Sequence, residues 1–216
     1  MKVALIGATG FVGQAVLNEL LQRGQQVTAI VRDSSKIASA ANLRPVVADV
    51  HDKATLTNSL KGHDVVISAY NAGWTNPNIY DDYLAGSAAI QAAVKASGVK
   101  RLIVVGGAGS LYISDNQQLV DTEGFPAEWK PGALAARDYL NIIKAEKELD
   151  WTFLSPAIEM HQGTSGKRKG AYRTGLEKPV FDENQRSVIS VEDLAVAIAD
   201  ELEHAKHIRQ RFTVAY

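Results

Sequence analysis

The stretch KVALIGATGFVG, residues 2–13, decides the fold of this 216-residue chain. It begins with an unbroken apolar run, passes through three glycines spaced three residues apart, and leads into an amphipathic run. Apolar residues recur every three or four positions through FVGQAVLNELLQRG (11–24), which ends on a glycine, as a helix often does. With the apolar run at 26–31 behind it, this order predicts a strand–helix–strand unit.

Similar short apolar, β-branched runs recur along the chain and indicate the strands of a sheet. They lie at 2–6, 26–31, 45–49, 64–70, 101–105 and 151–155. Continuous rather than alternating hydrophobicity is typical of parallel strands that are covered on both faces. We therefore predict an α/β fold: a single doubly wound, Rossmann-type domain over residues 1–216, with a mostly parallel sheet and helices on both faces.

Two long segments interrupt this regularity. Residues 106–131 and 156–186 are rich in glycine, proline and polar residues without any period, and each follows a strand. Long irregular segments in compact domains are commonly binding loops or lids. Both are predicted to build an acceptor site beside the carboxyl ends of the strands.

The C-terminal part returns to regular patterns. SVIS (187–190) predicts a short strand, and the following helix is expected to begin at Ser190, with Asp193 completing a capping box. RFTVAY (211–216) predicts a closing edge strand.

Composition narrows the classes of partner. The net charge is −1 at pH 7, so no global positive field would hold nucleic acid or an anionic membrane. The chain has no cysteine, which removes disulfides, thiolate metal sites and thiol catalysis and suits a reducing compartment. We expect a cytoplasmic protein without a metal site whose partner is a small molecule.

The three opening glycines predict a dinucleotide site. Gly7 allows the tight turn, Gly10 lets a pyrophosphate approach the backbone, and Gly13 lets the helix pack closely. The free amides at the positive end of the helix favour phosphate. The alternative is a glycine-rich turn in a domain that binds no ligand. The predicted contacts in this turn are Gly7, Thr9, Gly10, Phe11, Val12 and Gly13.

The G-x-x-G-x-x-G spacing resembles the short-chain dehydrogenase/reductase superfamily, in particular its atypical NmrA-like and biliverdin-reductase-B-like members. The segments VVGGAGSL (104–111), FPAEWKP (125–131) and DWTFLSPA (150–157) and the C-terminal stretch are most similar to an NADH-flavin reductase family within that group. The resemblance spans the chain. It implies a reductase that uses a nicotinamide cofactor.

The end of the second strand bears on the choice of cofactor. Arg32 comes first after the strand, with Ser34, Ser35 and Lys36 close behind as donors. An arginine there suits the 2′-phosphate of NADP(H), whereas Asp33 would suit the free ribose of NAD(H). The sequence favours NADP(H) and leaves NAD(H) open, and Arg32 as a plain surface charge is the third interpretation.

Four more residues are expected along the cofactor. The resemblance implies that Asp49 and Val50, after the third strand, border the adenine. Ala69 and Tyr70, after the fourth strand, are expected on the path of the dinucleotide.

The usual catalytic pair of the superfamily, Tyr-x-x-x-Lys, is missing. Its positions fall near Ala133 and Arg137, and Tyr139 and Lys144 are five residues apart, so they do not share the required helix face. Hydride transfer to a carbonyl needs a proton donor, whereas a flavin ring delocalises the charge it receives. The loss therefore favours a flavin-like acceptor.

Residues of the two long segments are candidates for the chemistry. The Ser110 hydroxyl is predicted to orient the nicotinamide or an acceptor, with plain turn chemistry as the alternative. His161 is a candidate donor to an acceptor, although a lone loop histidine is more often merely solvated. Trp74 and Trp129 are expected to pack rather than to stack on a flavin.

The compact basic run GKRKGAYR (166–173) has two interpretations. It is either a solvated loop, which is the favoured interpretation, or a phosphate clamp for FMN or for the cofactor.

The sequence thus predicts an NAD(P)H-dependent oxidoreductase, with NADPH favoured, that transfers hydride to FMN, riboflavin or a quinone-like acceptor. Flavin is expected as substrate rather than as a prosthetic group. One alternative is a non-catalytic NmrA-like dinucleotide sensor with a protein partner. Another is an isoflavone-reductase-like enzyme acting on a small aromatic molecule.

Overall fold

The computed structural model describes all of residues 1–216, and it begins with the expected unit: β1 (Lys2–Ile6), α1 (Phe11–Gln22) and β2 (Gln26–Val31). The other strands of the large sheet are β3 (Leu43–Val47), β4 (Val65–Ser68), β5 (Arg101–Val105), β8 (Asp150–Ser155), β9 (Arg173–Gly175) and β10 (Gln210–Ala215). The other helices are α2 (Lys53–Leu60), α3 (Ile79–Ser97), α4 (Lys130–Lys144) and α5 (Val191–His204). A small hairpin, β6 (Tyr112–Ser114) and β7 (Gln117–Gln118), and the 3-10 turns η1 (Ser34–Lys36), η2 (Ala108–Ser110), η3 (Leu119–Asp121) and η4 (Gln162–Thr164) complete the chain.

The sheet has eight strands in the order β3-β2-β1-β4-β5-β8-β10-β9, and only β9 is antiparallel. The chain moves outward from β1 to β3 and then returns to β4 on the other side of β1. In open α/β sheets, ligands bind at the carboxyl ends of the strands where the winding reverses. The predicted doubly wound fold is confirmed, and it places the crevice beside β1 and β4.

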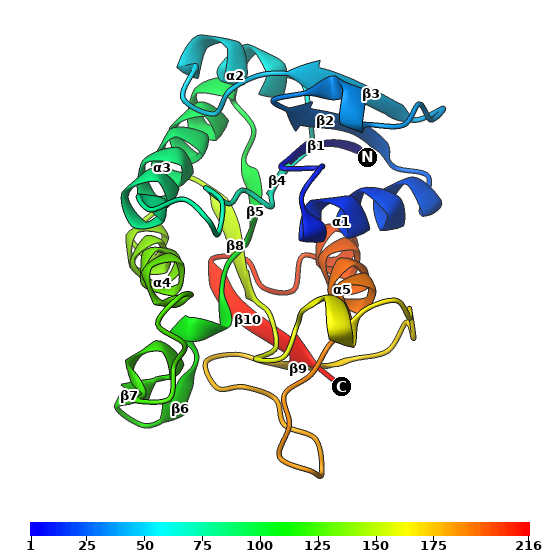
Figure 1. The fold of residues 1–216 in the computed structure, drawn as a ribbon. Coiled ribbons are helices and arrows are strands. Elements are labelled where there is room, and N and C mark those ends of the chain that lie inside the picture. The colour runs from blue at the N-terminus through cyan, green and yellow to red at the C-terminus, as the bar shows by residue number, and fades with distance from the viewer.

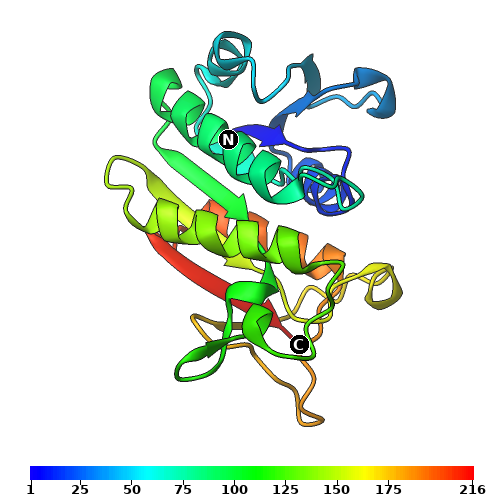
Figure 2. The same cartoon turned by 60° about the vertical axis from the view of Figure 1, so that its left-hand side comes forward.

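Helices cover both faces of the sheet. Figure 1 shows α1 and α5 on one face and α2, α3 and α4 on the other, and Figure 2 shows α3 and α4 running side by side. In β1, Val3 and Leu5 belong to the apolar core beneath α1 and α5, while Ala4 and Ile6 belong to the core beneath the other three helices. Because both faces are buried, the strand sequences show no polar alternation.

Several expected boundaries differ from the structure. The strands expected at 45–49 and 64–70 are β3 (Leu43–Val47) and β4 (Val65–Ser68), and SVIS forms only an isolated bridge from Val188 to Glu159. The prediction of an edge strand at the C-terminus is wrong, because β10 lies between β8 and β9. Strand β9 has three residues, too few to show a period.

The start of α5 keeps half of the expected capping box. The Ser190 hydroxyl accepts from the backbone N–H of Asp193 at 3.1 Å. The Asp193 carboxylate, which is fully buried, instead accepts from the backbone N–H groups of Lys169 and Gly170 at 3.0 and 2.7 Å and from the Tyr216 hydroxyl at 2.5 Å. This side chain therefore fastens the segment before β9 to the start of α5. None of the helices is long and apolar enough to cross a membrane.

Candidate functional site

The turn between β1 and α1 is set by two glycines that the protein itself requires. Gly7 has φ +81°, and a Cβ there would lie 2.6 Å from the carbonyl oxygen of Ala69. A Cβ on Gly13 would lie 2.0 Å from the carbonyl oxygen of Gly7. These distances confirm a tight turn at Gly7 and close packing at Gly13, where the helix meets the turn itself.

Gly10 is different, because nothing in the protein occupies the space beside it. Its φ of −79° suits any residue, and a Cβ there would meet only the Gly7 oxygen, at 3.4 Å. The backbone N–H groups of Phe11, Val12 and Gly13 have no partner in the protein, and no side chain caps the helix. An exposed helix start with bare amides, and no acidic residue in its first turn, fits a bound diphosphate. Thr9 and Phe11 are exposed beside it.

Two charged residues, Arg32 and Asp33, directly follow β2 and differ in their contacts. The Asp33 carboxylate accepts from the backbone N–H of Ser35 at 3.0 Å and from its hydroxyl at 2.7 Å, which caps η1. These hydrogen bonds hold the pKa of Asp33 below its ordinary value. Arg32 is exposed and has no hydrogen bond or ion pair. With Asp33 held in its own turn, the exposed charge at the end of β2 is the arginine.

The structure brings three predicted contacts together at the ends of β2, β3 and β4. Burial raises the pKa of the Tyr70 hydroxyl, and the charges of Arg32 and Asp49 also act on it, in opposite directions. Tyr70 donates to the carbonyl oxygen of Asp82 at 3.0 Å, which fixes its ring against α3. Val50 is partly buried next to Asp49, and Ala69 lies against the glycine turn.

Ser110 is buried, so its hydroxyl does not reach the surface where an acceptor would bind. It is 1 % exposed, and its hydroxyl accepts from Nη1 of Arg211 at 3.3 Å and donates to the carbonyl oxygen of Gly107 at 3.4 Å. The predicted contact with nicotinamide or acceptor stays a prediction, and it requires the η2 segment to shift.

His161 is exposed and caps η4. Its Nδ1 accepts from the backbone N–H of Gly163 at 3.1 Å, and Nε2 is left for a further contact. Trp74 lies against the start of α4 at Gly132, and Trp129 directly precedes that helix without a side-chain cap. Each of the two residues is about half exposed.

The positions of the usual Tyr and Lys are filled by other contacts. A Cβ on Gly109 would lie 3.0 Å from that of Ala133, so α4 packs closely against η2 at position 133. Arg137 is paired with Asp121 at 3.0 Å and with Asp138 at 3.1 Å. Tyr139 is buried among the packing residues of α4, and burial raises its pKa.

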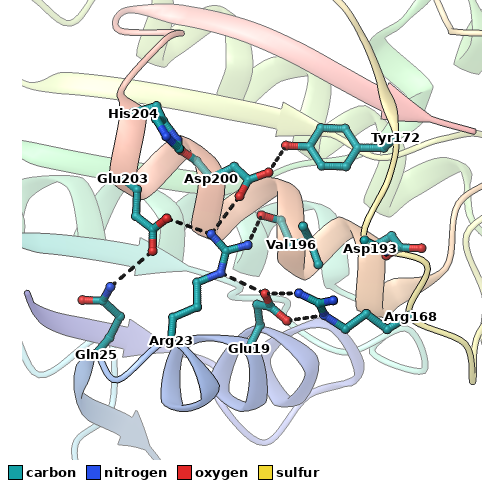
Figure 3. Close-up of polar contacts among 11 residues, drawn as sticks. Glu19, Arg23, Gln25, Arg168, Tyr172, Asp193, Val196, Asp200, Glu203 and His204 are labelled. Carbon is teal, nitrogen blue, oxygen red and sulfur yellow. Dashed lines mark hydrogen bonds and ion pairs between the residues drawn. The ribbon is translucent and has the colours of Figure 1, made fainter.

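Most of the basic run is exposed, as the solvated-loop interpretation predicted, but one of its arginines is held in an ion-pair network. Arg168 donates from Nε and Nη2 to both carboxylate oxygens of Glu19 at 2.8 and 2.9 Å, and Arg23 donates to the same carboxylate at 2.9 Å (Figure 3). Arg23 also pairs with Asp200 on α5 at 2.7 Å, and Asp200 accepts from Tyr172 at 2.5 Å. These bonds attach the segment before β9 to α1 and α5. The guanidinium of Arg168 is thus occupied by Glu19, which neither interpretation of the run included.

Two charged residues that the sequence did not single out lie at the acceptor loops. Arg211 is buried on β10, and Glu177 is partly buried just after β9. Burial of Glu177 would raise its pKa, but the hydrogen bond and the charge of Arg211 outweigh that effect and lower it. A single arginine in an apolar strand pattern gives no sign of such a pair.

Comparison with known proteins agrees with this geometry. A family model described as NAD(P)H-binding matches residues 7–205. YwnB of Bacillus subtilis is 37% identical over 99% of this chain and 98% of its own. A "putative epimerase" from Bacteroides thetaiotaomicron is 45% identical, with a TM-score of 0.92 over 100% of this chain and 96% of its own. A "putative NADH-flavin reductase" from Streptococcus pneumoniae is 34% identical, with a TM-score of 0.87 over 100% and 99%. The resemblance read from the sequence is confirmed.

The glycine turn predicts opposite outcomes for two matched substitutions. Gly13→Ala forces a Cβ onto the Gly7 oxygen and should lower the free energy of unfolding by about 2 kcal/mol or more. Gly10→Ala should stay within about 1 kcal/mol of wild type yet weaken dinucleotide binding at least tenfold, because its methyl group enters the space beside the bare amides. Denaturant unfolding and calorimetric titration measure both. Unchanged affinity in Gly10→Ala would contradict the site.

The Glu19 cluster predicts a pH-dependent contribution to stability. Hydrogen bonds from Arg168, against the opposing effect of burial, and from Arg23 hold the pKa of Glu19 below its ordinary value. A carboxyl whose pKa is lowered by folding stabilises the fold above its unfolded pKa of about 4.3, and this stabilisation is lost as the pH falls through the folded value. Glu19→Gln should cost about 2 kcal/mol at pH 7.

Denaturant unfolding of wild type and Glu19→Gln between pH 7 and pH 3 tests this contribution. The difference between their free energies of unfolding should shrink in acid. The control is Glu203→Gln, which removes a more exposed partner of Arg23 and should cost less than about 1 kcal/mol. A difference that grows in acid would contradict the assignment.

Proposed function

This chain belongs to the NAD(P)H-binding family, and from that premise we propose that it is an NADPH-preferring reductase that passes hydride to a flavin or a flavin-like conjugated acceptor. The amides of Phe11, Val12 and Gly13 bind the diphosphate, and Arg32 binds the 2′-phosphate of NADPH. Asp49 and Val50 border the adenine. Ala69 and Tyr70 lie along the path to the nicotinamide, which supplies hydride when it is bound.

The observation that carries the choice of acceptor is the filled position of the usual catalytic pair. Ala133 lies against η2 and Arg137 is held in two ion pairs, so neither delivers a proton to a developing alkoxide. Epimerisation at carbon also needs an acid or base, so the same observation weighs against that activity. A flavin or quinone-like ring delocalises the added charge, and the protein then needs only to hold two planar rings at hydride distance.

The acceptor is proposed as a substrate that comes and goes. The two segments 106–131 and 156–186 lie beyond the carboxyl ends of β5 and β8, and they supply the acceptor pocket with FMN, riboflavin or a quinone as its occupant. The name of the Streptococcus neighbour supports a flavin. His161, exposed at the start of η4, is the proposed donor to the acceptor through Nε2.

A sensor is the second candidate, and the filled catalytic position favours it equally. Such a protein binds the dinucleotide through the same amides, does not oxidise it, and acts on a protein partner.

Steady-state turnover separates the two candidates. Purified protein is expected to oxidise NADPH while it reduces riboflavin, FMN and quinones. The loss of NADPH absorbance at 340 nm monitors this reaction. His161→Ala removes this donor and should lower kcat/KM for the acceptor by about tenfold, since one positioned donor contributes about 1.4 kcal/mol. Tight NADPH binding with no turnover on any of these acceptors would refute the reductase and leave the sensor.

The preference for NADPH is tested at Arg32. Arg32→Ala removes the cation from the 2′-phosphate and should weaken NADPH at least tenfold while NADH changes less than twofold. Arg44→Ala, which removes another exposed arginine without an ion pair, is the matched control and should change neither. An unchanged ratio of the two dissociation constants in Arg32→Ala would refute the assignment.

A further inference from the structure

The side chain of Arg211 contacts both acceptor loops from inside the protein. It stands on β10 next to β8 and is 0% exposed, and it is one of the largest fully buried side chains of the molecule. Its Nη1 donates to the Ser110 hydroxyl at 3.3 Å and to the Ser155 hydroxyl, at the end of β8, at 3.4 Å. One nitrogen therefore joins the sheet to the 106–131 loop.

The second terminal nitrogen reaches the other loop. Nη2 of Arg211 pairs with the carboxylate of Glu177 and lies 3.4 Å from its carbonyl oxygen. That carbonyl oxygen also accepts from the backbone N–H of Tyr112 at 2.9 Å, and Lys144 lies 3.8 Å from the Glu177 carboxylate. The two loops meet at Glu177, and Arg211 holds them there.

Because the guanidinium of Arg211 is buried, its hydrogen-bond partners must keep their positions. A charged side chain without water is tolerated only when its hydrogen bonds are well placed, and a guanidinium offers them in one plane. Nε of Arg211 and the hydroxyl of Thr213, its neighbour on the same face of β10, have no partner in the protein. The fork therefore depends on the serine hydroxyls and on Glu177, and a change in either loop alters its hydrogen bonding.

We infer that Arg211 is a positioning residue for the acceptor site, which sets the mutual arrangement of the 106–131 and 156–186 loops through Ser110 and Glu177. It does not touch the dinucleotide turn, which lies at the other side of β4. Its loss therefore alters acceptor recognition and leaves dinucleotide binding intact. The kinetic part of this inference rests on the proposed reductase function, and the loop arrangement does not.

A second buried ion pair provides a matched control. Arg101, at the start of β5, pairs with Glu201 at 2.7 Å, and their side chains are 12% and 2% exposed. Its Nε also has no partner. The pair lies at the opposite ends of the strands from the acceptor loops, so Arg101→Lys should cost comparable stability without disturbing them.

The experiment compares Arg211→Lys, Glu177→Gln and Arg101→Lys with wild type. Hydrogen–deuterium exchange without ligand is expected to speed up at least fivefold in peptides of both loops for the first two variants, with no change at residues 7–13. In turnover, KM for FMN or riboflavin should rise at least tenfold while the dissociation constant of NADPH stays within twofold. The Glu177 side chain is about half exposed, so Glu177→Gln should fold even if Arg211→Lys does not, and it then tests the inference alone.

The outcomes are distinct. Faster exchange in both loops for the Arg211 and Glu177 variants, but not for Arg101→Lys, supports the positioning role. This holds even if wild type turns over no acceptor, because absence of turnover refutes only the reductase. Exchange that changes in one loop alone, or equally in the Arg101 control, overturns it. An active enzyme with unchanged acceptor KM in Glu177→Gln also overturns it.

Discussion

The close approach of α1 to the carbonyl oxygen of Gly7 is the constraint on which the rest of the structure depends. A side chain at Gly13 would occupy the place of that oxygen, and one at Gly7 would occupy the place of the Ala69 oxygen at the end of β4. The turn is thereby fixed against two neighbouring strands at the point where the winding of the sheet reverses. The backbone amides of Phe11, Val12 and Gly13 are unpaired beside this turn, and bare amides at the positive end of a helix favour an anion. The turn that packs α1 against β1 and β4 is therefore also the site proposed for a diphosphate.

Buried charges play the corresponding part for the irregular half of the molecule. The segments 106–131 and 156–186 contribute few residues to the two apolar cores, so hydrophobic burial does little to fix them. Carboxylates and guanidinium groups hold them instead: Glu19 holds Arg168, Asp193 holds two backbone amides, and Arg211 holds both loops. Such contacts are directional and costly to break, because each leaves a charge without its partner. They allow loops to keep a defined shape without regular structure.

The sequence was sufficient for the parts of the fold that depend on periodicity. Strands buried on both faces and an amphipathic helix after three glycines predicted the doubly wound sheet and the dinucleotide turn. It was insufficient where tertiary contacts decide. Strand β9 is too short to show a pattern, and its pairing moves β10 away from the edge. Arg211 stands in an apolar stretch that predicts only a strand. Ser110 sits in a glycine-rich turn and bonds to that distant arginine. The ion pair of Arg168 left no sign in the sequence because its partner, Glu19, is 149 residues away.

We propose above that the unpaired amides at the start of α1 bind the diphosphate of a nicotinamide dinucleotide. Amide NMR signals followed during a titration with NADPH test it most directly. We expect saturable shifts that are largest for Phe11, Val12 and Gly13, with smaller ones around Tyr70. Signals of these three amides that stay in place at millimolar dinucleotide, whatever happens elsewhere in the spectrum, would contradict it.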